Sequence, residues 1–350
     1  MSEFQCVLDQ FCLETSGEGE GEGEWSVVPL GNGNINGTYA VKKINKINKN
    51  SKISFVLQEI NHNVFKDVDG LMSNMVSVTD HLRAKGVRTL ELVPVRDLSS
   101  HQYHYFSPTE HKYWRVFKYI PFCKSADDQS LITCQDVFVS AKAFGDFQYQ
   151  LRDLELSTLR ETIPNFHNTR YRFNSFQNVL KNESLERLKT IQEVRDDIDF
   201  ILSRENKYVD VLLTLKDAVS DQAVPLRVVH NDTKISNVLL SEESEEAVCV
   251  IDLDTVMPGI SLYDFADIVR STCSTCGEEE SEFSLIKFRL DMFHAAADGY
   301  LSSQMCFGVD MDMGSNGRLW PAEIDHLYIA GQVYSNCDSF SDCRTYFSML

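Results

Sequence analysis

The stretch from Val228 to Asp254 constrains the fold more than any other part of this chain. It reads Val-Val-His-Asn-Asp-Thr-Lys-Ile-Ser-Asn-Val-Leu-Leu, then an acidic turn, then Val-Cys-Val-Ile-Asp-Leu-Asp. Short apolar runs on either side of the turn at 241–246 predict two neighbouring strands. Polar residues stand at fixed spacing around these runs: His230, Asp232, Lys234, Asn237, Asp252 and Asp254.

This spacing is typical of protein-kinase-like phosphotransferases. Phosphoryl transfer from ATP needs a carboxylate that orients and deprotonates the attacking hydroxyl, and Asp232 is the candidate. Mg²⁺ takes hard oxygen ligands and few of them from protein, so Asn237 and Asp252 are the candidate metal ligands. Lys234 is a candidate for neutralising charge on the transferred group. Together these are the expected catalytic residues: Asp232, Lys234, Asn237 and Asp252.

Asp252 and Asp254 lie two residues apart on a predicted strand, so both carboxylates are expected on one face. Like charges on one face repel unless a cation or a hydroxyl lies between them. A plain structural interpretation also exists, in which residues 230–233 form a polar turn and the two aspartates end a strand. Only the complete set, in order, favours catalysis.

Three segments carry a resemblance to a known family: His230–Lys234, Ile251–Gly259 and Tyr263–Arg270. They resemble the aminoglycoside phosphotransferase superfamily and, within it, the N-acetylhexosamine 1-kinases. The resemblance implies an α+β, two-lobed, protein-kinase-like fold that uses ATP and Mg²⁺. We expect a flexible acidic N-terminus at 1–24, an antiparallel-sheet nucleotide-binding lobe at 25–118, and a mostly helical catalytic and substrate lobe at 119–350.

Charge and composition exclude several classes. The 350 residues carry 33 basic and 52 acidic side chains, a net charge of −19, which argues against binding nucleic acid or an anionic membrane. No apolar run is long enough to span a bilayer, and residues 1–24 lack a signal-peptide pattern. Ten scattered cysteines then predict reduced thiols in a cytoplasmic protein. The Gly-Glu repeat at 17–24 predicts flexibility.

The nucleotide side is less regular. Glycines between two predicted strands at 25–41 form an ordinary hairpin turn or, ahead of the catalytic stretch, a nucleotide lid. The next predicted strand, from Ser54, lacks the lysine that protein kinases use, and Glu59 would repel a triphosphate if it faced one. A strand ending at Pro121 predicts a hinge whose backbone binds adenine, or simply an edge strand. The ATP-binding candidates are Gly31, Gly33, Thr38, Gln58, Tyr119 and Ile120.

Helical periodicity predicts a helix over 68–85 that ends at Gly86, and others over 137–151, 263–270 and 283–301. A further helix is predicted to begin at Pro321, since proline is favoured in a first turn. Residues 90–94 and 113–121 are predicted strands and 257–259 a turn. An ion pair between Asp267 and Arg270 is expected to brace the catalytic strands. Cys273-Ser-Thr-Cys276 has no second pair and does not predict zinc.

The family resemblance also implies the acceptor, the anomeric hydroxyl of an N-acetylhexosamine, and therefore a small-molecule sugar partner. Asn34 stands where the relatives commonly carry histidine, and His167 either lines a sugar pocket or is a buried structural histidine. The substrate-binding candidates are Asn34, Asn36, His167, Asp254 and Arg270. Two alternatives stay open: another acceptor such as an aminoglycoside, choline or homoserine, and an inactive nucleotide-binding scaffold.

Overall fold

The chain forms two compact units. The small unit comprises Met1–Cys123 and Ser157–Ile163, and the large unit Lys124–Leu156 and Pro164–Leu350. The computed structural model describes residues 3–13, 23–31, 35–45, 51–97, 102–126, 131–181, 194–210, 213–214, 224–276, 280, 282 and 284–303. Gly33, Asn34, most of the Gly-Glu repeat and the helix expected from Pro321 lie outside these residues.

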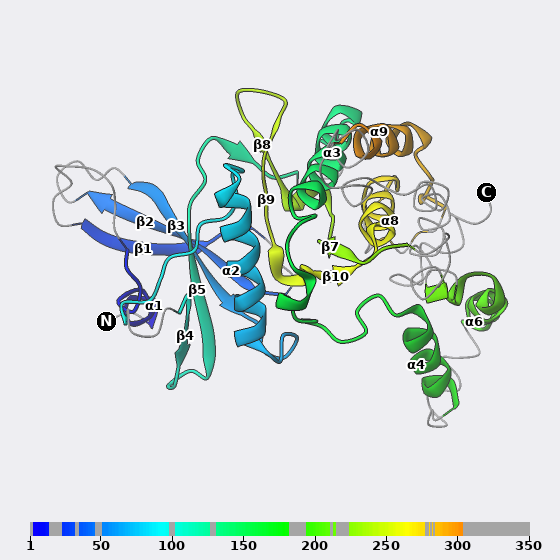
Figure 1. Ribbon diagram of the computed structural model, residues 1–350, viewed down its shortest axis with the longest axis horizontal. Coiled ribbons are helices and arrows are strands. Elements are labelled where there is room, and N and C mark those ends of the chain that lie inside the picture. Colours follow the sequence, from blue (N-terminus) through cyan, green and yellow to red (C-terminus); the bar gives the residue numbers. More distant parts are fainter. Residues whose placement is uncertain are drawn as a thin grey trace. The chain divides into compact units, whose positions relative to one another are not determined.

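An antiparallel five-stranded sheet forms the small unit (Figure 1). Its order is β1 (Gly23–Pro29), β2 (Gly37–Asn45), β3 (Ser51–Ile60), β5 (Lys112–Lys118) and β4 (His104–Ser107). Gly31 follows β1 with φ +70°, a left-handed conformation that favours glycine. The predicted strand at 90–94 forms only a bridge between Leu92 and Phe117. Pro94 ends it because proline cannot donate to a ladder.

Helix α2 (Val68–Ala84) is the predicted helix of this unit. Its apolar positions at Leu71, Met75, Val78 and Leu82 recur at helical spacing and are all buried. Asp67 caps its first turn by accepting from Gly70 N at 2.9 Å, and Gly86 beyond its end has φ +72°. In the described residues, no helix is both long enough and apolar enough to cross a membrane.

The N-terminus departs from the expectation of a flexible segment. Helix α1 (Glu3–Leu8) forms there, and Val7, Leu8 and Phe11 are at most 2% exposed in the core of the small unit. Phe4 packs on Tyr39 with ring centroids 4.8 Å apart. The expectation was wrong for residues 3–13 because Phe4, Val7 and Leu8 lie on one face of α1, and Phe11 beyond its end forms a β-bridge with Val95.

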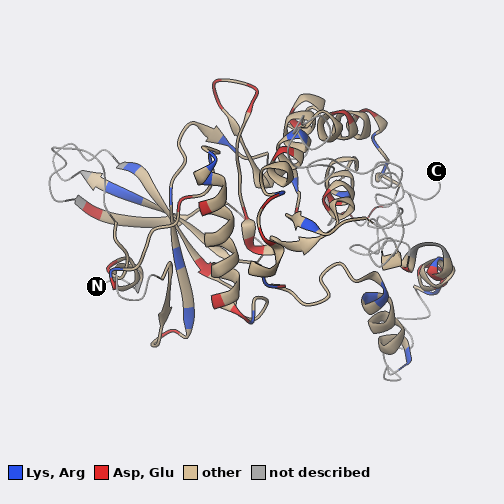
Figure 2. Cartoon of the chain, viewed as in Figure 1, with Lys and Arg blue, Asp and Glu red and all other residues tan. Residues whose placement is uncertain are grey.

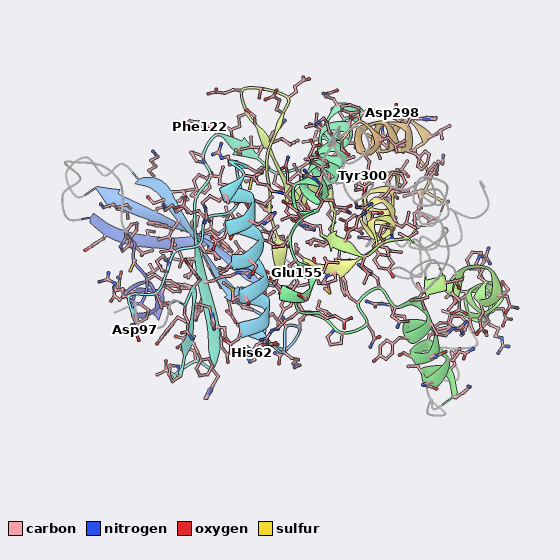
Figure 3. All side chains as sticks on the ribbon, viewed as in Figure 1. His62, Asp97, Phe122, Glu155, Asp298 and Tyr300 are labelled. Atoms are coloured by element: carbon pink, nitrogen blue, oxygen red, sulfur yellow. The ribbon has the colours of Figure 1, made fainter. Side chains whose placement is uncertain are left out.

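The large unit packs three helices around one core: α3 (Cys134–Gln150), α8 (Ser261–Thr272) and α9 (Leu290–Leu301). Tyr300, labelled in Figure 3, lies on the α9 helix of this unit. Its hydroxyl donates to Gln148 Oε1 on α3 at 3.2 Å. The helix predicted over 283–301 begins only at Leu290 in the structure. Further helical elements are η2 (Leu156–Thr158), α4 (Thr169–Lys181), α6 (Arg195–Leu202) and η3 (Glu205–Val209).

Short strands carry the central stretch of the sequence. β8 (Val238–Ser241) and β9 (Ala247–Val250) form the predicted hairpin, whose turn is acidic (Figure 2). β7 (Arg227–Val229) pairs with β10 (Met257–Gly259), so the predicted turn at 257–259 is a strand. This pairing is invisible locally because its partner lies some thirty residues earlier in the chain. The short strand β6 (Cys123–Lys124) lies where the chain passes from the small unit to the large one.

Candidate active site

The loop that follows β7 brings three of the four predicted catalytic residues together. Asn237 ends the short helix η4 (Ile235–Asn237) and donates from Nδ2 to Asp232 O at 2.8 Å and to Asp232 Oδ2 at 3.0 Å. Lys234 Nζ lies 3.8 Å from Asp232 Oδ1. The Asp232 side chain keeps 27% of its surface exposed, so a hydroxyl can reach it. Residues 230–237 are called the catalytic loop below.

A buried carboxylate on α8 fixes the catalytic loop by accepting hydrogen bonds from its backbone. Asp264 is 0% exposed and accepts from His230 N at 2.9 Å and from Asn231 N at 2.7 Å. Gln148 Nε2 donates to the same carboxylate, and Thr233 Oγ1 donates to Asp264 O. Burial raises the pKa of Asp264, while His230 and the two backbone N–H groups oppose that shift. The bracing expected of this helix is therefore centred on Asp264, which was not among the predicted site residues.

Two hydrogen bonds connect the catalytic loop to the segment that carries Asp252. Ile251 N donates to Asn237 O at 2.9 Å, and His230 Nε2 lies 2.9 Å from Ile251 O. Asp252 follows directly, beyond the end of β9. The fourth predicted catalytic residue is therefore the chain neighbour of Ile251, whose backbone contacts the catalytic loop.

Asp252 and Asp254 do not share one face of a strand, so that expectation was wrong. β9 ends at Val250, Asp252 has φ +58°, and residues Leu253–Thr255 form the short helix η5. Asp252 is exposed, whereas Asp254 is 2% exposed. The left-handed turn, which aspartate tolerates better than most residues, cancels the strand period of two. A cation shared between the two carboxylates is therefore not required.

The oxygen donors fit a magnesium ion that is held mainly by a nucleotide. The Nδ2 group of Asn237 is used on Asp232, which orients its Oδ1 away from that carboxylate, and Asp252 presents an exposed carboxylate. Within the described residues no group of three or more His, Cys, Asp or Glu side chains could hold a metal. Mg²⁺ bound through one or two protein oxygens, waters and phosphates needs no such group.

Burial, together with a neighbouring carboxylate, makes Asp232 a stronger base than an ordinary aspartate. Burial, followed by the nearby Asp267 carboxylate, raises the pKa of Asp232, while Lys234 and His230 lower it less. Asp267 itself is paired with Arg270, with Nη2 and Oδ1 2.8 Å apart. Both side chains of that pair are buried, at 2% and 6% exposure. The predicted ion pair exists, and its carboxylate lies near the catalytic loop.

His167, one of the predicted substrate-binding residues, contacts the catalytic loop. Its Nε2 lies 3.2 Å from Asn231 O, and its ring centroid is 4.9 Å from that of Tyr263. Burial lowers the pKa of His167 to about 4, so the ring is neutral near pH 7. Asn36 belongs to the small unit, where its Oδ1 accepts from Asn61 N at 2.9 Å.

The small unit contains a buried arginine that was not predicted from the sequence. Arg115 on β5 donates to Gln58 Oε1 from Nε at 2.9 Å and from Nη2 at 2.6 Å, and it is 1% exposed. Gln58 Nε2 in turn donates to Thr38 Oγ1 at 3.1 Å. An arginine inside the apolar run Tyr-Trp-Arg-Val-Phe is the signal that could have identified it. Thus Gln58, on the strand that carries the phosphate-pairing lysine in protein kinases, contacts a buried guanidinium.

Two further predicted features of the small unit can be placed. Glu59 forms an ion pair with Lys112, with Oε2 and Nζ 3.0 Å apart. At the predicted hinge, Tyr119 N donates to Ser54 O at 3.0 Å, so an adenine would find the carbonyl of Tyr119 rather than its N–H. Ile120 follows and is half-buried.

Comparison with known proteins gives a consistent assignment. The sequence profile described as the phosphotransferase enzyme family matches residues 26–297. The fold is similar to the GDP and kanamycin complex of APH(2")-IIia, with TM-score 0.53, 13% identity, and coverage of 90% of this chain and 84% of that one. It is also similar to a microcompartment-associated aminopropanol kinase, with TM-score 0.54, 13% identity, and coverage of 99% and 97%. These likenesses confirm the predicted kinase-like fold, and the chain belongs to the phosphotransferase enzyme family.

Proposed function

We propose that this protein transfers the γ-phosphoryl group of Mg-ATP to a hydroxyl of a small neutral acceptor, the anomeric hydroxyl of an N-acetylhexosamine. The observation that carries the proposal is the arrangement of Asp232, Asn237 and Lys234 on a loop braced by Asp264. A carboxylate with a raised pKa, beside an amide and an ammonium group, is what hydroxyl activation at a phosphate requires.

Each residue has a separate task in this proposal. Asp232 orients the acceptor hydroxyl and takes its proton, and Lys234 offsets negative charge on the transferred group. Asn237 and Asp252 would hold Mg²⁺, which bridges and neutralises the phosphates when it is bound. In the small unit, Gln58, Thr38, Gly31, Tyr119 and Ile120 are the proposed nucleotide contacts. Gly33 and Asn34 remain proposals from the sequence alone.

A neutral acceptor is favoured because the acidic side chains around the catalytic loop already have partners. Asp264 accepts backbone N–H groups, and Asp267 pairs with Arg270. His167 is neutral near pH 7 and offers directional hydrogen bonding rather than charge. The resemblance at Asn165–Thr169 and Asp252–Gly259 adds the amino sugar, with His167, Asn36, Asp254 and Arg270 as proposed contacts.

The rival proposals predict different patterns of ATP consumption across a panel of acceptors. An inactive scaffold would be favoured if Glu59 faced and repelled the triphosphate, but Glu59 pairs with Lys112 within the sheet. ATP consumption should be followed with N-acetylglucosamine, N-acetylgalactosamine, kanamycin, choline and homoserine, and the product identified by phosphorus NMR. We expect a sugar 1-phosphate. Turnover only with a cationic acceptor would contradict the sugar assignment, and absence of any turnover would contradict the kinase assignment.

A further inference from the structure

A short segment of the chain leaves the large unit and returns to it. Residues Ser157–Ile163, called the strap here, belong to the small unit although helices of the large unit precede and follow them in sequence. Leu159 and Thr162 of the strap are buried, at 8% and 5% exposure. The strap is therefore packed into the small unit rather than draped over it.

One side chain of helix α2 forms two hydrogen bonds with the backbone of the strap. Asn74 Nδ2 donates to Arg160 O at 2.8 Å, and Arg160 N donates to Asn74 Oδ1 at 2.8 Å. Asn74 is 1% exposed, so both bonds are shielded from water. A single carboxamide thus satisfies both polar backbone groups of one residue, the way a neighbouring strand would.

The first turn of α2 is shaped around the same contact. Asp67, which caps α2, also forms an ion pair with Arg160, with Oδ2 and Nη1 3.1 Å apart. Gly70 leaves room for the strap, since a Cβ there would lie 2.9 Å from Arg160 Cδ and 2.3 Å from Asp67 Oδ2. Asp67, Gly70 and Asn74 follow at helical spacing on one face of α2. The helix therefore holds the strap along two turns.

The chain continues from the strap into the turn that carries His167. Asn165 has φ +59°, Asn168 Nδ2 donates to Asn165 Oδ1 at 3.0 Å, and Arg172 Nε donates to Phe166 O at 2.7 Å. These bonds make the turn a defined structure. His167 on that turn contacts the catalytic loop at Asn231 O. Between the clamped Arg160 and His167 there are only a few residues of chain.

We propose that Asn74 is a positioning residue for phosphoryl transfer, which couples helix α2 to the catalytic loop through the strap and His167. The proposal rests on the proposed function. Protein kinases fix the corresponding helix by an ion pair with the strand lysine. Here β3 has no lysine between Phe55 and Ile60, and the α2 side chains near Arg115 are Met72 and Met75, whose sulfur atoms lie 3.9 Å from Nη1. The Asn74 contact gives α2 a different fixed point.

The test compares transfer with hydrolysis. Water needs no positioned acceptor, so loosening the strap should reduce transfer to the acceptor more than it reduces ATP hydrolysis. For Asn74→Leu, and for the milder Asn74→Asp, which keeps an acceptor but loses the donor, we expect the ratio of transfer to hydrolysis to fall about 5- to 30-fold. Thr79→Val is the matched control, because Thr79 is equally buried on α2 but bonds only within its helix, to Met75 O and Val76 O. It should leave the ratio unchanged.

A double-variant cycle separates positioning from general loss of stability. If Asn74 acts through His167, then Asn74→Asp and His167→Gln together should lower the ratio no further than the stronger single change. Additive effects, or an equal fall for Thr79→Val, would overturn the proposal.

Hydrogen exchange provides a readout that does not depend on activity. Asn74→Asp should speed amide exchange at residues 157–163, at 165–168 and at Asn231, compared with Thr79→Val. Faster exchange confined to 157–163 would show that the strap transmits nothing to the catalytic loop. This measurement stands even if no acceptor is found, so failure of the proposed function and failure of the coupling can be told apart.

Discussion

The catalytic loop and the β3–β5 strand pair each bury a charged side chain, but they use it differently. At the loop, the Asp264 carboxylate of α8 accepts backbone N–H groups of His230 and Asn231. In the sheet, the Arg115 guanidinium donates to the side chain of Gln58, while the backbones are held by their own ladder. The path of the loop therefore depends on one carboxylate, whereas the path of the strands does not depend on Arg115. Substitutions should separate the two cases.

The largest expected effect comes from the residue that the loop presents. Asp232→Asn keeps the shape but cannot accept the hydroxyl proton, so turnover should fall about 10²–10⁴-fold while nucleotide binding survives. Because the pKa of Asp232 is raised, the wild-type rate should decline on acidification at a higher pH than an ordinary aspartate would give. Steady-state kinetics and calorimetry provide both measurements. Asp210→Asn, which removes an exposed partner of Arg170, is the control.

Asp264→Asn tests the dependence of the loop on its brace. The amide offers one oxygen where the carboxylate offers two, so at least one buried N–H of the loop loses its acceptor. We expect unfolding free energy to fall by about 2–4 kcal/mol and turnover to fall with it. Asp146→Asn on α3, which removes an ion pair with Lys142, is the matched control. Unchanged turnover in a folded Asp264→Asn protein would contradict the brace.

Gln58→Leu tests the sheet. The buried N–H groups of Arg115 that face Gln58 lose that acceptor, which should cost about 1–3 kcal/mol of unfolding free energy. Adding Arg115→Met should recover part of the loss, because an apolar pair needs no hydrogen bond. No such second change is available for the loop, whose donors are backbone groups. Urea denaturation of the single and double variants decides between these outcomes.

The buried His167, which contacts the catalytic loop, should make the stability of the protein depend on pH. Its pKa is about 4 in the folded protein and ordinarily near 6.5, so between these values the unfolded chain binds a proton that the folded chain does not. Stability is then complete above pH 6.5 and is lost as pH falls toward 4. We expect about 1–2 kcal/mol less unfolding free energy at pH 5 than at pH 7.5 from this group. The His167→Gln protein should lack that part of the slope.

The smallest effect is expected at Glu59. Its pair with Lys112 is partly exposed, at 27% and 36%, and such pairs contribute about 0–1 kcal/mol. Glu59→Gln should therefore change stability by less than about 1 kcal/mol and ATP affinity little. A marked gain in ATP affinity that shrinks as salt rises would instead mean that the carboxylate faces the phosphates.

Features set by neighbouring residues were predictable from the sequence. The β8–β9 hairpin, helix α2 with Gly86 beyond its end, and the Asp267–Arg270 pair each follow from spacing within a few residues. The approach of Asn237 to Asp232 belongs to the same class, because the two residues are five apart.

Features set by distant partners were not predictable. Asp264 meets the loop across more than thirty residues, and Arg115 meets Gln58 across 57. The pairing of β7 with β10 hid a strand in what looked like a turn. A single backbone angle at Asp252 reversed the expectation for two aspartates. Each error arose where tertiary contacts or one residue's conformation overrode a local pattern.

The division of the chain into interleaved pieces limits how such a gene can recombine. The small unit is completed only when Ser157–Ile163 has been synthesised, well after Cys123. A gene fragment that stops at Cys123 would leave Asn74 facing no backbone and Leu159 absent from its packing. Neither unit can therefore be exchanged by a single crossover, and an exchange that keeps both intact must carry the strap along with the sheet.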